Sequence, residues 1–142
     1  MTEIKKKNEE LYVLANKIVK NSKVVILGLT FKENTPDIRN SKVFDIIENL
    51  KEYEINPIIV DPLANKEEAE LVYGIKLTDF EDINEVDCLV LAVNHDIYIN
   101  KPFEDFEKMF KKIDGEENII IDIKSILNKD RVLEKGYHYW SL

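Results

Sequence analysis

The stretch KVVILGLTFKENTPDIRNSKVFDIIENL, residues 23–50, contains the pattern that decides the fold. Its first six residues form a β-branched run that ends at Gly28, which is typical of a strand buried on both faces of a sheet. Its last eight residues carry apolar side chains at helical spacing, namely Val43, Ile46, Ile47 and Leu50. The stretch therefore predicts a strand, a long connection and an amphipathic helix.

The alternation of strand and helix continues along the chain. Further strands are predicted at PIIVDP (57–62), DCLVLAV (87–93) and NIIIDI (118–123), with an edge strand at YHYWSL (137–142). Helices are predicted at NKEEAELVYG (65–74), at the spacing of Phe103, Phe106 and Phe110, and at SILNKDRVLEKG (125–136), with a short strand and a turn of helix in 75–86. The predicted fold class is α/β, a Rossmann-like three-layer sandwich with a mainly parallel sheet.

The N-terminus predicts a separate helix. Apolar residues recur there at helical spacing, at Leu11, Leu14, Ala15 and Ile18. We expect residues 1–21 to form an N-terminal helix that ends a connecting segment. Residues 22–142 are then expected to form one domain, because the 142-residue chain is too short for two full-sized domains.

Composition excludes several classes of protein. The chain is 44% apolar and 34% charged, and no apolar run approaches the roughly 20 residues of a membrane helix. The N-terminus lacks the apolar core of a signal peptide, so we expect a cytoplasmic location and no contact with a membrane. A net charge of -8 argues against a nucleic-acid partner, because such proteins usually present a basic stripe.

Few side chains suggest reactive chemistry. The single cysteine, Cys88, lies inside an apolar run and is expected to be a buried structural thiol. His138, between two tyrosines, is also expected to be structural, and no pair of acids has the spacing of a metal site. Three hydroxyl side chains are predicted to be helix caps rather than nucleophiles, namely Thr35, Ser41 and Ser125.

A ligand site is predicted at one edge of the sheet. In open parallel sheets, ligands bind beyond the carboxyl ends of the strands. The connection that follows the first strand has about a dozen residues, against roughly 2–6 in ordinary units of this type. Lys32, His95 and Lys124 all follow predicted strands, so they are expected on this same edge, where they suit an anionic ligand. His95 could touch the ligand or a partner domain.

Two further features of this edge leave alternatives open. Arg39 could contact a ligand, or it could pair with Asp37 or Glu33 and brace the loop. A dinucleotide is not expected, because Gly28 is not followed by the further glycines of the pyrophosphate fingerprint. Asp61 occupies the place of a ribose-binding acid but is equally suited to forming a turn before a proline.

The segment GLTFKENTPDIRNS (28–41) resembles the hallmark of the C-terminal domain in the UDP-glucose/GDP-mannose dehydrogenase family. The resemblance continues through VDP, LAVNH, IIDIKSIL and the terminal YW-L, and it covers about residues 21–142. The form N-T-P-D-I-R-N-S is most similar to the UDP-N-acetylglucosamine and UDP-N-acetylgalactosamine 6-dehydrogenases, which supply uronic acids for polysaccharides.

The resemblance implies a role for this domain in binding a UDP-sugar. Family members use NAD to oxidise the sugar C6 alcohol to a carboxylate in two steps. By the resemblance, Phe31 and Lys32 contact the UDP-sugar, and Lys124 supplies a second positive contact, although many members have arginine there. Asp37 and Arg39 are then expected to brace the loop, and residues 22–142 to be the UDP-sugar-binding domain.

The departures from the family imply that this chain is inactive alone. The family's catalytic cysteine lies in a glycine-rich stretch of a preceding domain, and Cys88 does not match it. NAD is expected to serve the full-length enzyme and not to bind this chain. Expected partners are the UDP-sugar, the NAD-binding and central domains of the same enzyme, and a second copy in a homodimer. The alternative is a stand-alone interaction or regulatory domain that has lost nucleotide binding.

Overall fold

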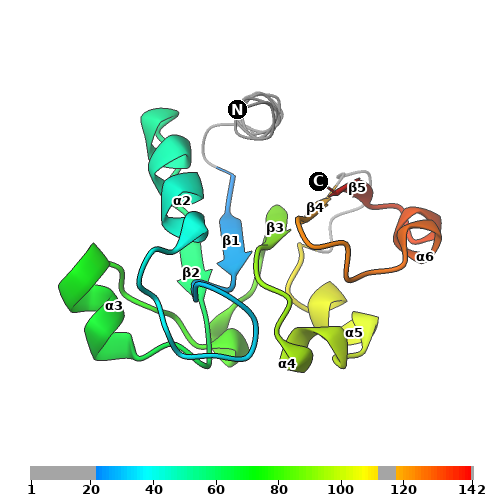
Figure 1. Ribbon diagram of the computed structural model, residues 1–142. Helices are drawn as coiled ribbons and strands as arrows, with labels where there is room; N and C mark the ends of the chain where they lie inside the picture. The colour runs from blue at the N-terminus through cyan, green and yellow to red at the C-terminus, as the bar shows by residue number, and fades with distance from the viewer. Residues whose placement is uncertain (1–21, 112–117, 142) are drawn as a thin grey trace, which may run out of the picture.

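Five parallel strands form one sheet in the computed structural model, which describes residues 22–111 and 118–141. The strands are β1 (Val24–Leu27), β2 (Ile58–Val60), β3 (Cys88–Leu91), β4 (Ile119–Asp122) and β5 (His138–Ser141). Their order across the sheet is β2-β1-β3-β4-β5, so β5 is an edge strand as predicted (Figure 1). The register pairs the last residues of the strands with one another: Leu27 with Val60 and Leu91, and Asp122 with Leu91 and Ser141. The chain therefore leaves the strands along a common edge of the sheet.

Helices cover both faces of the sheet. The helices are α2 (Lys42–Glu52), α3 (Lys66–Tyr73), α4 (Asp96–Ile99), α5 (Phe103–Glu107) and α6 (Lys129–Glu134), with a 3₁₀ turn, η1 (Phe80–Asp82). Because side chains alternate along β1, Val24 and Ile26 pack into the core under α2 and α3. Val25 and Leu27 pack instead into the core formed with α4, α5 and α6. These two cores confirm the predicted three-layer α/β fold.

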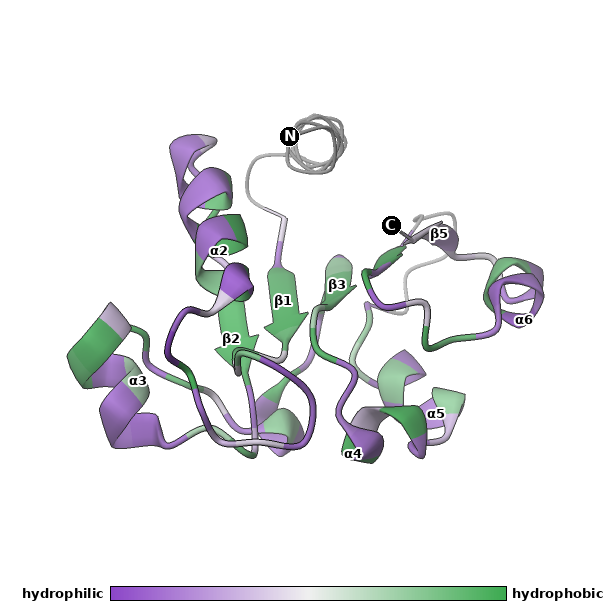
Figure 2. Ribbon diagram, viewed as in Figure 1, coloured by the Kyte–Doolittle hydropathy of each residue, from purple (hydrophilic) through white to green (hydrophobic). Residues whose placement is uncertain are grey.

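Hydropathy follows this layered arrangement. Strands β1, β2 and β3 are apolar, whereas the long loop after β1 is mainly polar (Figure 2). Continuous apolar strands are expected when both faces of a sheet are buried. No helix in residues 22–111 or 118–141 is long and apolar enough to cross a membrane.

Several predicted elements differ from the structure. No strand forms in 75–86, where η1 is the only regular element and Ile75 and Leu77 are buried in the core. The helix expected around the phenylalanines is reduced to α5, and Phe110 forms an isolated bridge instead. The helix expected in 125–136 begins only at Lys129, after a turn held by Asp122. The predicted N-terminal helix lies outside the described residues.

Candidate functional site

The strand order reverses between β1 and β3, and ligands in open α/β sheets bind at such a switch point. Two connections meet there: the loop of residues 28–41 leaves β1, and residues 92–95 leave β3. Gly28 lets them approach closely. It has φ +107, and an added Cβ would lie 2.6 Å from Val93 Cβ, so any larger residue would force the two segments apart.

The loop of residues 28–41 is tied together at its base. Ser41 Oγ donates to the Leu29 carbonyl at 2.6 Å, which joins the two ends of the loop. Tyr73 of α3 donates its hydroxyl to the Ile38 carbonyl at 2.5 Å. The side chains of Leu29 and Ile38 are fully buried beneath the loop. The loop is therefore a packed unit rather than an open connection.

The predicted capping roles of three hydroxyl groups are wrong. Ser41 stands at the N-cap position of α2, but its hydroxyl makes no capping hydrogen bond because it donates to the Leu29 carbonyl instead. Thr35 donates to the Lys32 carbonyl at 3.3 Å, inside the loop. Ser125 lies in a turn with φ +55, and Asn128 caps α6 instead.

Asp61 organises the connections that leave β1 and β2. It is only 3% exposed, and its Oδ2 accepts the backbone N–H groups of Leu29 and Thr30 at 2.7 and 3.1 Å. Its Oδ1 accepts those of Leu63 and Ala64 at 2.9 and 3.3 Å. Both oxygens are thus occupied within the protein, which leaves neither available for a ribose hydroxyl.

His95 is fully buried beside this carboxylate. Its Nε2 lies 3.1 Å from Asp61 Oδ2, and its Nδ1 accepts the backbone N–H of Asn34 at 2.9 Å. Burial alone would raise the pKa of Asp61, but the hydrogen bonds from His95 and from the Leu29 N–H more than offset it, and the pKa is lowered. Asp61 is therefore a carboxylate at neutral pH, and both ring nitrogens of His95 have partners within the protein.

The side chains expected to contact the ligand lie on the outside of the same edge. Phe31 is 48% exposed, and Lys32 and Lys124 are also exposed. Within residues 22–111 and 118–141, neither ammonium group has a hydrogen bond or an ion pair. The strands that precede these lysines, β1 and β4, are separated only by β3, so their ends lie about 10 Å apart. The loop of residues 28–41 and the turn after β4 therefore bring two exposed cations to the same edge of the sheet, where an anionic group could bind.

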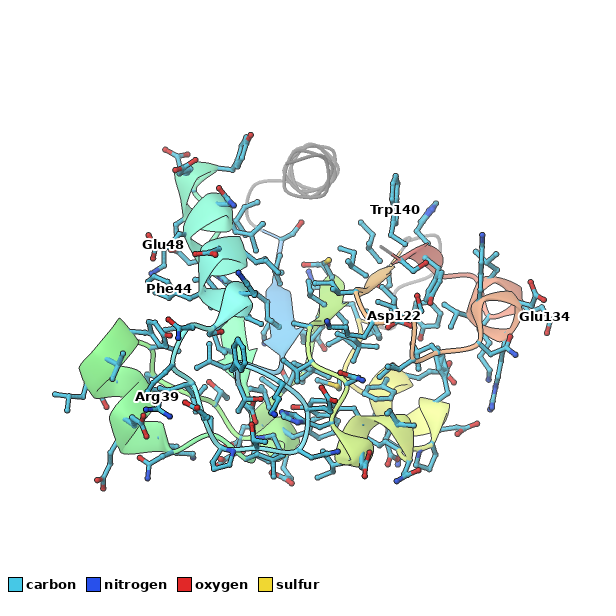
Figure 3. All side chains as sticks on the ribbon, in the orientation of Figure 1. Arg39, Phe44, Glu48, Asp122, Glu134 and Trp140 are labelled. Carbon is cyan, nitrogen blue, oxygen red and sulfur yellow. The ribbon has the colours of Figure 1, made fainter. Side chains whose placement is uncertain are left out.

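Asp37 and Arg39 contact each other at the surface of the loop. Arg39 Nε and Nη2 each donate to an Asp37 carboxylate oxygen at 3.0 Å, and this hydrogen bonding lowers the pKa of Asp37 to about 2. Arg39 lies beside α3 (Figure 3), and the charge of Glu68 on that helix acts on it. An exposed pair of this kind contributes little to stability.

Comparison with known proteins places the chain in a family. Residues 25–129 match the model of the UDP binding domain of the UDP-glucose/GDP-mannose dehydrogenase family. The chain belongs to this family. Protein CapL of Staphylococcus aureus is 40% identical over 124 residues, and the UDP-N-acetyl-D-glucosamine 6-dehydrogenase of Pseudomonas aeruginosa is 37% identical over 113 residues. These matches cover 87% and 80% of the chain but only 28% and 26% of the relatives, so the chain spans little more than a quarter of their length.

Solved structures of two dehydrogenases share the fold. The NDP-N-acetyl-D-galactosaminuronic acid dehydrogenase of Methanosarcina mazei superposes with a TM-score of 0.77 over 94% of this chain and 28% of its own length, at 22% identity. A dehydrogenase from Pyrococcus horikoshii superposes with a TM-score of 0.67 over 93% of the chain and 28% of its own, also at 22% identity. At this identity the likeness establishes the fold of the domain.

The switch point of this family member does not fit a dinucleotide. The backbone N–H groups of Leu29 and Thr30, which would face a pyrophosphate after a glycine-rich turn, donate to Asp61 instead. Asp61 in turn has no free oxygen for a ribose. A dinucleotide would therefore find neither free backbone donors for its pyrophosphate nor a free acid for its ribose at this turn.

Sequence reasoning missed the buried polar groups that shape the site. For Asp61 the sequence suggests a ribose-binding acid or a turn former, and neither role includes its contact with His95. The contact of His95 with Asn34 has no signal in the sequence, because residues 34, 61 and 95 lie far apart in the chain. Asp122 was missed in the same way. It is fully buried at the end of β4 (Figure 3) and accepts the N–H groups of Ile126 and Leu127.

Proposed function

We propose that this chain binds a UDP-sugar as the C-terminal domain of an NAD-dependent UDP-N-acetylhexosamine 6-dehydrogenase. The observation that carries the proposal is the pair Phe31–Lys32, which a packed loop presents to solvent at the switch point of the sheet. The names of the relatives support the class of substrate, since one of them, from Pseudomonas aeruginosa, is a UDP-N-acetyl-D-glucosamine 6-dehydrogenase. The product would be a UDP-uronic acid for polysaccharide synthesis.

The proposed roles follow from the chemistry of the side chains. Lys32 and Lys124 bind the diphosphate, because ammonium groups form strong charge-assisted hydrogen bonds with phosphate oxygens. Phe31 packs against the nucleotide, and Asp37 and Arg39 brace the outer part of the loop. This chain supplies recognition, whereas the oxidation and the binding of NAD take place on the other domains of the enzyme. We place the enzyme in the cytoplasm, with a homodimer as its assembly.

Calorimetric titration of the 142-residue chain with UDP tests the proposal. Replacing Lys32 by alanine removes a charge-assisted hydrogen bond, so we expect the Kd for UDP to rise about tenfold or more. Lys124→Ala should weaken binding in the same way, and both effects should shrink as salt is added.

The control is Lys51→Ala, which removes an exposed lysine in the last turn of α2 that pairs with Glu48 of the same helix and lies at the opposite edge of the sheet. Its affinity for UDP should equal that of the unmodified chain. Undiminished binding by Lys32→Ala would remove Lys32 from the site. A chain that binds no UDP would favour the alternative of an interaction domain without a ligand.

A further inference from the structure

Two of the residues proposed to contact UDP, Phe31 and Lys32, lie in a turn that is held at both ends. This contact turn comprises residues 30–34. At its first end, the Thr30 N–H donates to Asp61 Oδ2 at 3.1 Å. At its last end, the Asn34 N–H donates to His95 Nδ1 at 2.9 Å, and Asn34 Oδ1 accepts the Asp96 N–H at 2.8 Å. Between these ends the three side chains of residues 31–33 are all exposed.

His95 touches both ends of the contact turn from below. Its Nδ1 receives the hydrogen bond from Asn34, and its Nε2 lies 3.1 Å from Asp61 Oδ2 and 3.3 Å from Thr30 Oγ1. The Thr30 hydroxyl donates its hydrogen to the Lys32 carbonyl at 2.8 Å, so towards the ring it can only accept. A single buried side chain therefore connects the start and the end of the turn.

These contacts select one form of the imidazole. A backbone N–H can only donate, so Nδ1 must carry a lone pair where it meets Asn34. The proton then resides on Nε2, which donates to the Asp61 carboxylate. Asn34 itself has φ +60, a conformation that asparagine tolerates better than most residues. The ring is thus neutral and fixed in the Nε2–H tautomer.

We infer that His95 is a positioning residue that fixes the contact turn in the conformation that presents Phe31 and Lys32 to the UDP-sugar. It touches no ligand, because it is fully buried. The inference rests on the proposed function for the identity of the ligand. If removing the ring leaves the turn in its binding conformation about one-tenth of the time, the apparent affinity falls about tenfold.

Two variants and a control separate positioning from general stability. His95→Leu keeps an apolar side chain of similar size but loses both hydrogen bonds, whereas His95→Asn keeps an acceptor close to the position of Nδ1. The control is Tyr98→Phe, which removes a buried hydroxyl beside His95 that bonds to the Val60 carbonyl at 3.4 Å and does not touch the turn. Affinity for UDP is measured by calorimetry on the 142-residue chain, and hydrogen exchange of the Asn34 amide by NMR.

We expect His95→Leu to bind UDP about tenfold more weakly, with faster exchange at Asn34. His95→Asn should recover part of both losses, and Tyr98→Phe should bind as the unmodified chain does. The nitrogen-15 spectrum of the unmodified chain should show the proton of His95 on Nε2. Wild-type affinity in a folded His95→Leu chain, or a proton on Nδ1, would overturn the inference. If the unmodified chain binds no UDP, the proposed function fails, and the tautomer and the Asn34 exchange still decide whether His95 holds the turn.

Discussion

The carboxylate of Asp61 receives five hydrogen bonds at the end of β2. Four come from backbone N–H groups of the two connections beside it, and one comes from His95. A buried carboxylate without partners would be costly, but one that is fully hydrogen-bonded can fix the surrounding backbone. At the scale of single residues, Asp61 is therefore the main determinant of the shape of the site.

Replacing Asp61 by asparagine should lower stability in a pH-dependent way. The asparagine NH2 group would face backbone N–H groups that now donate to a carboxylate oxygen, so donors would meet donors. We therefore expect a loss of about 2–3 kcal/mol in the free energy of unfolding at pH 7. Because the folded-state pKa of Asp61 is lowered, its contribution is present above the ordinary pKa of about 3.9 and is lost as the pH falls through the folded value. Urea denaturation should therefore show the difference between the two chains shrinking below about pH 4.

The control for this prediction is Asp37→Asn. Asp37 also has a lowered pKa, of about 2, but it lies in an exposed pair with Arg39. Its replacement should leave the unfolding curve at pH 7 nearly unchanged. Equal effects of the two substitutions would contradict the structural role given to Asp61.

Gly28 should tolerate no side chain. In Gly28→Ala the new Cβ would meet Val93 at 2.6 Å, in a backbone conformation that alanine rarely adopts. Overpacking and strain together should cost about 2–4 kcal/mol of stability, measured by urea denaturation. Gly74→Ala is the matched control, because that glycine has φ +68 but no atom within 4 Å of a new Cβ. It should cost only about 1 kcal/mol, and a similar loss at both sites would mean that the contact with Val93 can relax.

At the scale of elements, the loop of residues 28–41 depends on the helix beside it. Tyr73 of α3 stacks on Phe44 of α2 with ring centroids 4.5 Å apart, and its hydroxyl reaches the Ile38 carbonyl. The hydroxyl oxygen of Tyr73 also accepts the Ser41 N–H at 3.3 Å. The loop is thereby attached to α3 as well as to its own ends.

Tyr73→Phe should loosen the loop while leaving the helices packed. The ring keeps its contact with Phe44, so the loss should be about 1–2 kcal/mol from the two hydrogen bonds. Amide exchange should become faster at residues 38–41. The control is Tyr137→Phe, which removes a hydroxyl whose hydrogen bond to Glu107 is long and weak, at 3.5 Å. It should change neither the stability nor the amide exchange at residues 38–41 appreciably. Unchanged exchange at residues 38–41 in Tyr73→Phe would show that Leu29 and Ser41 suffice to hold the loop.

At the scale of the whole molecule, the only cysteine is part of the sheet. Cys88 lies in β3 and is 1% exposed, and burial raises the pKa of its thiol. A thiolate is the reactive form, so Cys88 cannot serve as a nucleophile in the folded domain. We expect the folded chain to react slowly with a thiol reagent and quickly once urea has unfolded it.

The same reasoning predicts that the purified chain forms no NADH from any UDP-sugar. Absorbance at the NADH band measures this directly. The control is the same assay after Cys88→Ala, which should give the same zero rate. Appreciable turnover by the unmodified chain would mean that residues of this domain carry out the oxidation.

The sequence by itself determined the strands, most of the helices and the edge of the sheet on which the exposed lysines lie. Such features depend on local periodicity, because an apolar run or a helical repeat reports how each short segment is buried. It also identified the family, whereas the contact of Phe31 and Lys32 with a ligand stays a prediction. It failed where elements were short, as at 75–86 and 125–128, because there tertiary contacts outweighed local preference.

Only the tertiary structure decided how the site is held together. The contact of Asp61 with Leu29 and the contact of His95 with Asn34 each join segments that lie far apart in the chain. The sequence spacing of such residues does not predict their contact, because it is the order of the strands in the parallel sheet that brings their connections to one edge. The exposed residues proposed to meet a ligand could thus be named from the sequence, whereas the buried residues proposed to position them appeared only once the strands were placed side by side.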